Sequence, residues 1–295
     1  MATLIAFDTA TERMTVALRH RERVFAHDGE GGARASATLL PAILALLAEA
    51  GIALADLDAI AFGRGPGAFT GLRTACSVAQ GLAFGAGRPV LPIDSLLAVA
   101  EDARGDAASL RLWALIDARM DQIYAAEYEH DASRWTTRVA PFLTDCDALA
   151  ARWRAAPPAA IAGNAIGAFG ARLKTGEATL FAAATPSALA LLRLAAQGWA
   201  DGVAVDPALA LPLYVRDKVA DTEAERAAQR EKGAPKEPAP PSRREGSEAG
   251  REQPDTAQRS EAGREQSDTA QRSEAGREQS APAQRGGAQR SEPAR

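Results

Sequence analysis

Four glycines fall within residues 63–73, GRGPGAFTGLR, and this spacing requires a tight turn between two regular elements. The apolar residues 59–62 before it are typical of a buried strand, and Thr70 is a candidate N-cap of a helix that runs to about residue 85. Glycine permits positive φ and lets backbone N–H groups approach an anion at a helix N-terminus. The loop therefore predicts either a phosphate or anion site that includes Gly65 and Gly67, or only a tight turn.

Two nucleotide-binding signatures can be compared with this loop. The Walker pattern ends in Gly-Lys-Ser or Gly-Lys-Thr, and the loop contains no lysine. The dinucleotide fingerprint fits better, because Gly65, Gly67 and Gly71 precede an apolar run at 89–93 and a candidate ribose-binding acid, Asp94. That fingerprint normally opens the first strand–helix unit, whereas here two strands and a helix come first. A dinucleotide-binding protein stays an alternative.

The start of the chain predicts a β-hairpin with a polar tip, since residues 4–7 and 14–18 are apolar or alternating. An aspartate at the end of the first strand, followed by hydroxyl residues, is how actin-like and Hsp70-like ATPase folds begin their phosphate site. Asp8 is thus a candidate ligand of a magnesium-bound water or phosphate, with Thr9 and Thr11 as candidate donors. Alternatively, Asp8 caps its own turn through its side chain.

Four segments together resemble the bacterial TsaB (YeaZ) family: residues 5–11 (IAFDTAT), 63–73, 116–120 (IDARM) and 212–216 (PLYVR). The Gly-Pro-Gly-x-Phe-Thr-Gly-Leu-Arg element is highly specific, and the ordered match covers residues 1–216. The resemblance implies a non-catalytic scaffold subunit of the complex that forms N6-threonylcarbamoyladenosine next to the anticodon of tRNAs reading codons that start with A. It also implies a catalytic partner, TsaD, with a homologous ATPase fold, an associated ATPase, TsaE, and a homodimer when the partner is absent.

Composition agrees with a cytoplasmic protein of this kind. A hydrophobic content of 46% in 295 residues supports a buried core over much of the chain, and no apolar run is long enough to predict a membrane span. Cys76 and Cys146 lack metal-binding or redox spacing and are expected to be reduced thiols. The net charge of -4 argues against a large tRNA-binding surface, so tRNA contact is expected only indirectly, through a partner.

The order of elements predicts a duplicated α/β fold of the actin-like or Hsp70-like ATPase class (ASKHA) with two lobes. Residues 1–105 are expected to form the N-terminal lobe, and residues 106–216, including a helix at 187–200, the C-terminal lobe. Residues 217–295 contain no Leu, Ile, Phe, Met, Trp or Tyr, and residues 247–285 are three 13-residue repeats. Such composition predicts a disordered, low-complexity tail.

No catalytic site, metal site or cofactor is predicted. TsaD-like proteins hold a metal with a His-x-x-x-His pair on the helix that corresponds to residues 36–50, and this stretch contains no histidine. The three histidines of the chain are expected to be surface or capping residues: His20, His27 and His130. An alternative enzyme is a small ATPase-fold kinase that uses Asp8 and the glycine loop, with residues 163–167 as a weak adenosine-side turn. No general base can be identified for it.

The helix after the glycine loop predicts a partner interface. Gly71, Ala75, Ala79 and Ala83 recur every four residues and so form a low ridge that a second helix can approach closely. Further apolar or small residues extend around the helix, more than one buried face requires. TsaD or a second copy of the chain is expected there, and Ala79→Glu or Ala83→Glu should block association of a folded monomer. The predicted interface residues are Gly71, Leu72, Ala75, Cys76, Val78, Ala79, Leu82 and Ala83.

In the second predicted hairpin, Asp117 and Arg119 lie in the turn. They could reach a cleft or a partner. An Asp–Arg pair in a tight turn can equally hold its own loop through hydrogen bonds.

Overall fold

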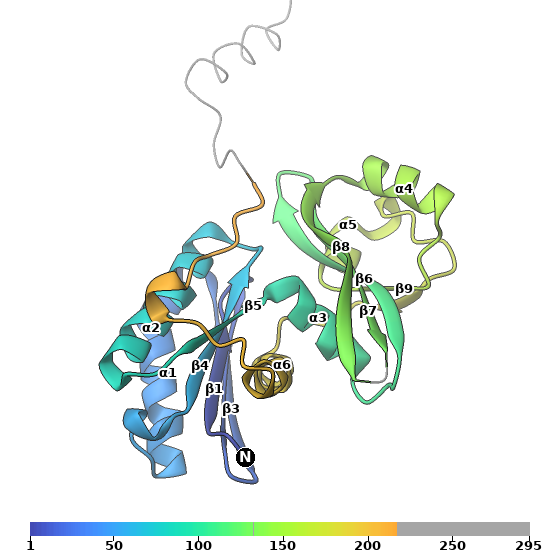
Figure 1. The fold of residues 1–295 in the computed structure, drawn as a ribbon. Helices are drawn as coiled ribbons and strands as arrows, with labels where there is room; N and C mark the ends of the chain where they lie inside the picture. The colour runs from blue at the N-terminus through green and yellow to red at the C-terminus, as the bar shows by residue number, and fades with distance from the viewer. Residues whose placement is uncertain (132, 217–295) are drawn as a thin grey trace, which may run out of the picture. The chain divides into compact units, whose positions relative to one another are not determined.

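The computed structural model describes residues 1–131 and 133–216, all of which belong to one compact unit. The expected tail and its repeats lie outside the described residues. The unit contains two five-stranded sheets with helices against them (Figure 1).

The first sheet has the strand order β3-β2-β1-β4-β5. Strands β1 (Leu4–Asp8), β2 (Arg13–His20) and β3 (Arg23–Glu30) pair antiparallel, whereas β4 (Ala59–Gly65) is parallel beside β1 and β5 (Val90–Asp94) is parallel beside β4. The expected hairpin is thus confirmed. A dinucleotide-binding fold would instead carry the glycine fingerprint directly after a first strand with parallel neighbours on both sides. The observed order does not match that alternative.

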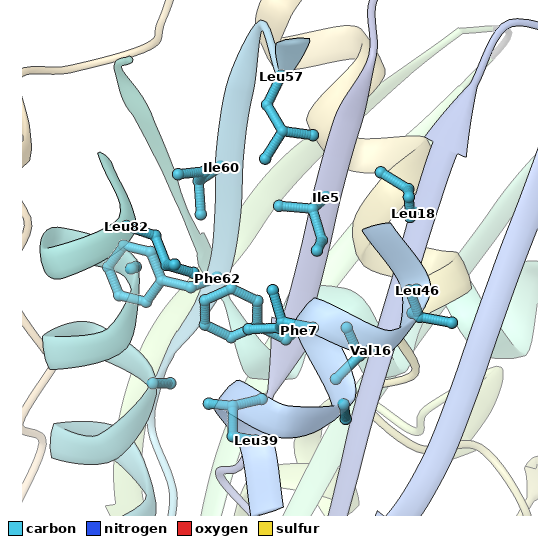
Figure 2. Packing of buried hydrophobic residues seen from close by; sticks show 14 of the residues in the cluster. Ile5, Phe7, Val16, Leu18, Leu39, Leu46, Leu57, Ile60, Phe62 and Leu82 are labelled. Atoms are coloured by element: carbon cyan, nitrogen blue, oxygen red, sulfur yellow. The ribbon is translucent and has the colours of Figure 1, made fainter. Parts of the chain in front are cut away.

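Helices α1 (Ala35–Ala50) and α2 (Phe69–Ala86) cover one face of the first sheet (Figure 1). Figure 2 shows alternate strand residues such as Phe7 and Phe62 packing beneath these helices, as the period of two in a strand requires. Thr70 is not the N-cap of α2. The cap residue is Ala68, whose side chain makes no capping bond, and its N–H donates to the Ala10 carbonyl at 2.7 Å.

The other face of the first sheet is covered by α6 (Ala188–Ala200). Sequence reasoning expected this helix in the second lobe. Its buried stripe, which includes Leu191 and Leu192, instead packs against β1 and its neighbours around Leu4 and Ala6. An apolar stripe shows that a helix packs on something, but it carries no information about which sheet it covers.

The second sheet repeats the plan of the first, with the order β8-β7-β6-β9-β10. Strands β6 (Leu110–Arg119), β7 (Gln122–Asp131) and β8 (Arg134–Thr144) pair antiparallel, and β9 (Ala160–Ala162) and β10 (Thr179–Phe181) follow in parallel. This repetition confirms the duplicated α/β fold. Strands β8 and β10 were not predicted from the sequence.

Helices from both halves of the chain cover the second sheet. One face packs against α3 (Ser95–Arg104) through Leu96 and Val99, although α3 follows β5 of the first sheet. The opposite face packs against α4 (Cys146–Ala155) and the short α5 (Ala165–Phe169), which occupies the stretch expected to be a turn. Each sheet is therefore covered partly by a helix that comes after a strand of the other sheet: α6 follows β10 and covers the first sheet, and α3 follows β5 and covers the second.

Candidate functional site

The glycine loop is packed against the polar tip of the first hairpin. A Cβ added at Gly67 would overlap the Ala10 carbonyl, and one at Gly71 would overlap the Thr9 carbonyl. The Thr9 hydroxyl also donates to the Gly71 carbonyl at 2.7 Å. These glycines are thus required by the close approach of the chain to itself. This supports the tight-turn interpretation of the loop and leaves the anion site as a prediction.

Asp8 and Gly65 meet below this loop in a hydrogen-bonded network. Asp8 is fully buried, its Oδ1 accepts from the Ala10 N–H at 2.6 Å and its Oδ2 accepts from the Ser95 hydroxyl at 2.6 Å. Ser95 Oγ in turn accepts from the Gly65 N–H at 3.2 Å. Burial raises the pKa of Asp8 to about 6, although both hydrogen bonds favour the charged form. Asp8 therefore caps its own turn, with one protein donor on each carboxylate oxygen, and its magnesium or phosphate role stays a prediction.

Metal-ligating side chains do not gather in the part of the chain that the structure describes: no group of three His, Cys, Asp or Glu side chains there could hold an ion. Of the histidines expected to be surface or capping residues, His130 is not on the surface: it is buried, with its Nδ1 3.0 Å from the Ala108 carbonyl. Cys76 and Cys146 are free and buried. Burial raises the pKa of both thiols.

The turn of the second hairpin holds itself together and also reaches the first hairpin. The Arg119 N–H donates to Asp117 Oδ1 at 2.8 Å, and the Asp117 N–H donates to Asn164 Oδ1 at 2.9 Å. The Arg119 guanidinium pairs with both Asp117 and Glu12. A cavity of about 390 Å³ lies here, lined by residues of the first hairpin, the glycine loop and the second hairpin.

The last described residues connect the two halves of this region. The Leu213 N–H donates to the Arg64 carbonyl at 2.7 Å, and the Arg216 guanidinium donates to the Ala118 carbonyl at 3.0 Å and to Gln122 Oε1 at 2.6 Å. Residues 212–216 therefore run from the glycine loop to the second hairpin. Their motif contributed to the family resemblance, but the sequence did not show that it lies beside the glycine loop.

The predicted ridge on α2 is buried inside the chain. Ala75, Ala79 and Ala83 have no exposed surface, and Val78 packs against the same core. The other predicted interface residues are buried as well: Gly71, Leu72, Cys76 and Leu82. Part of the remaining surface of α2 is covered by residues 207–210, because the Gln80 amide donates to the carbonyls of Pro207 and Ala210 at 3.2 and 3.1 Å. This corrects the expected interface: the additional apolar face serves the chain's own C-terminal segment.

A different side of α1 and α2 is exposed. Phe84 is 62% exposed, and Leu40 and Leu44, one helical turn apart on α1, are 41% and 51% exposed. A Cβ added at Gly81 or Gly85 would meet no neighbouring atom within 4 Å. We call these five residues the outer helix surface. None of them was among the predicted interface residues.

Comparisons with known proteins identify the relatives of this chain. Residues 32–164 match the family model TsaD, tRNA N6-adenosine threonylcarbamoyltransferase. The tRNA threonylcarbamoyladenosine biosynthesis protein TsaB of Escherichia coli is 32% identical over 232 residues, which cover 74% of this chain and 96% of that protein. The protein of the same name from Haemophilus influenzae is 44% identical over 133 residues, which cover 45% of this chain and 56% of that protein.

Solved structures of related proteins indicate the same family. YeaZ from Pseudomonas aeruginosa superposes with a TM-score of 0.66 at 41% identity, over 72% of this chain and 100% of that one. A second structure, described as an uncharacterized protein with similarity to peptidase YEAZ from the same organism, gives 0.67 at 40% identity, over 73% of this chain and 100% of that one. Among the described helices, none has the length and apolarity to cross a membrane. The chain belongs to the TsaB (YeaZ) family of tRNA threonylcarbamoyladenosine biosynthesis proteins.

Proposed function

We propose that the chain is a non-catalytic, cytoplasmic subunit of the complex that forms N6-threonylcarbamoyladenosine in tRNA, and that it binds a TsaD-like catalytic subunit. The observation that carries this proposal is the closed glycine loop. The Ala10 and Thr9 carbonyls of the first hairpin occupy the space beside Gly67 and Gly71, and both oxygens of Asp8 accept hydrogen bonds from protein donors. An ATPase-fold enzyme would need those groups open to a phosphate or its magnesium ion. Nothing in the described residues favours the kinase alternative.

The outer helix surface is the proposed contact with the TsaD-like subunit. Helix α1 has 16 residues and α2 has 18, yet each carries a single charged residue, Glu49 and Arg73 respectively. A surface helix normally presents a charged or polar face to water. Instead, Leu40, Leu44 and Phe84 are exposed there, and apolar surfaces of this kind mark protein contacts.

The family match supports a TsaD-like partner. The TsaD model covers residues 32–164, which include both α1 and α2. A TsaD-like partner would therefore present a helix pair equivalent to this one, and like surfaces can meet about a pseudo-twofold axis. A second copy of the chain could occupy the same surface when the partner is absent. The TsaE-like ATPase would join this assembly, and the partner would supply most of the tRNA contact.

Isothermal titration calorimetry with the purified TsaD-like subunit tests the proposal. We expect Phe84→Glu to weaken binding by at least about tenfold, because a carboxylate would be desolvated in the contact. Leu180→Glu is the matched control, since Leu180 is 46% exposed on β10 of the second sheet. Equal affinity of wild type and Phe84→Glu would show that the outer helix surface is not the interface. Tight ATP binding with phosphoryl transfer by the chain alone would favour the kinase alternative.

A further inference from the structure

An exposed aromatic platform lies at the start of α2. The rings of Phe69 and Tyr214 have centroids 5.5 Å apart and are tilted by 39°. The Arg73 guanidinium carbon lies 3.8 Å from the centre of the Phe69 ring, and Arg73 Nε donates to the Tyr214 hydroxyl at 3.1 Å. Phe69 is 36% exposed and Tyr214 is 47% exposed. The hydrogen bond and the stacked cation thus hold two partly solvent-facing rings in fixed positions.

A small cavity adjoins this platform. It has a volume of about 180 Å³ and is lined by Leu72, Tyr124, Leu213 and Arg216 together with the two rings. Tyr124 also lines the cavity of about 390 Å³, so this side chain borders both spaces. Tyr124 is 8% exposed, and its phenol carries both a donor and an acceptor. It can therefore donate to or accept from a ligand.

The charge around the platform is positive. Within the described residues, Arg73 and Arg216 have no carboxylate partner within salt-bridge distance, and their hydrogen bonds go to neutral oxygens and to the sulfur of Met120. Arg119 also lines the small cavity, but Glu12 and Asp117 neutralise it. Two guanidinium groups without carboxylate partners thus lie beside two partly exposed aromatic rings.

We propose that Phe69, Arg73, Tyr124, Tyr214 and Arg216 bind one unpaired nucleotide of an RNA strand. Unstacked RNA bases bind to aromatic side chains and arginine planes without requiring a particular sequence, and arginines pair with the phosphates. The small cavity is below the usual range of about 300–1,000 Å³ for drug-sized ligands, which suits a single ring or phosphate. A contact of one nucleotide is also compatible with the net charge of -4, which disfavours an extended RNA footprint.

This site deepens the proposed function, because it rests on that function for the identity of the RNA as tRNA. It needs no catalysis by the chain. Binding of the nucleotide would instead give the complex one direct contact to RNA outside the partner subunit. The outer helix surface consists of other residues, so the two proposals can fail separately.

Fluorescence anisotropy with a fluorescein-labelled single-stranded RNA hexamer and the full chain tests the site. Stacking of a base on an aromatic ring is worth about 1–3 kcal/mol, so Tyr214→Ala should weaken binding by about 5- to 150-fold. Tyr214→Phe keeps the ring and should retain most of the affinity. Arg73→Gln should lower the slope of log affinity against log salt by about 0.7. Phe84→Ala, at the other end of α2, is the control and should bind like wild type.

Circular dichroism melts of each variant show whether it remains folded. Equal affinity of wild type and folded Tyr214→Ala, or no hexamer binding by wild type, would overturn the proposal. Displacement of the hexamer by AMP as effectively as by unlabelled hexamer would assign the site to a free nucleotide instead. If Tyr214→Ala weakens binding of the TsaD-like subunit but not of the hexamer, the cluster is a protein contact. Loss of partner binding in Phe84→Glu with hexamer binding retained would support both proposals independently.

Discussion

The buried carboxylate of Asp8 should make the stability of the chain depend on pH. Its pKa lies at about 6 in the fold, against an ordinary value of 3.8, because burial disfavours the charged form. The folded state therefore binds the proton more tightly than the unfolded state. Stability from this group is fully present below about pH 4 and is lost as pH rises through about 6. The difference between the two pKa values corresponds to about 3 kcal/mol.

Asp8→Asn isolates this effect, since the amide stays neutral and can still accept from the Ala10 N–H. In this variant an amide group replaces the carboxylate oxygen that accepts from Ser95, which lowers the free energy of unfolding by an amount that does not vary with pH. From about pH 4 to about pH 7, the free energy of unfolding of Asp8→Asn relative to wild type should therefore rise by about 2.4 kcal/mol, most of the full difference. Urea titrations followed by tryptophan fluorescence measure it, with the exposed Asp28→Asn as a control.

Titration of every other group is shared by wild type and Asp8→Asn, so it cancels in the difference. A difference that stays constant across the pH range would refute the assignment of a raised pKa to Asp8. Stabilisation by magnesium of wild type but not of Asp8→Asn would contradict the closed turn and support the predicted magnesium role.

Three further outcomes are expected. Gly71→Ala should lower the free energy of unfolding by about 1–3 kcal/mol, because the added Cβ overlaps the Thr9 carbonyl. Gly81→Ala should raise it by up to about 1 kcal/mol, because the added Cβ there meets no neighbouring atom. Thermal melts of the two variants compare these effects. Glu101→Gln should cost about 2–3 kcal/mol near neutral pH, less than for a fully buried pair, because Arg104 loses its charged partner while Arg193 is 45% exposed to solvent. Hydrogen bonds from those arginines and Trp135 overcome the opposing effect of burial and lower the pKa of Glu101, so this penalty should shrink as pH falls through the folded pKa in denaturant titrations. Truncation after Arg216 should leave the melting temperature nearly unchanged, because the composition of residues 217–295 cannot supply a core; a clear drop in differential scanning fluorimetry would show otherwise.

The sequence predicted elements whose pattern is local. Strands β1, β2 and β4 are short apolar or alternating runs, and α1, α2 and α6 are long enough for their type to be clear. Strand β8 was missed because it has no fully buried residue and contains Pro141, so its pattern is that of a polar loop. The cap of α2 was misplaced because a backbone contact, rather than a Thr70 side chain, fixes its start.

The candidate sites needed tertiary information. The small residues of α2 correctly indicated close packing, but only the structure shows that the sheet, α1 and residues 207–210 use those faces. Phe69 and Tyr214 belong to two motifs that carried the family resemblance, yet nothing in either motif places their rings together. Similarly, Asp8 at the end of β1 suggested a phosphate site, and its donor Ser95 is 87 positions away.

The central claim is that the chain supports the reaction without performing it. Its most direct test measures N6-threonylcarbamoyladenosine in tRNA by mass spectrometry after reconstitution with the TsaD-like subunit and the other pathway proteins. We expect no product from the chain alone, product with the full set, retention of activity with Asp8→Asn, and loss with Phe84→Glu. Loss of product with a folded, partner-bound Asp8→Asn variant, or product from the chain without its partner, would place chemistry in the glycine loop and contradict the claim.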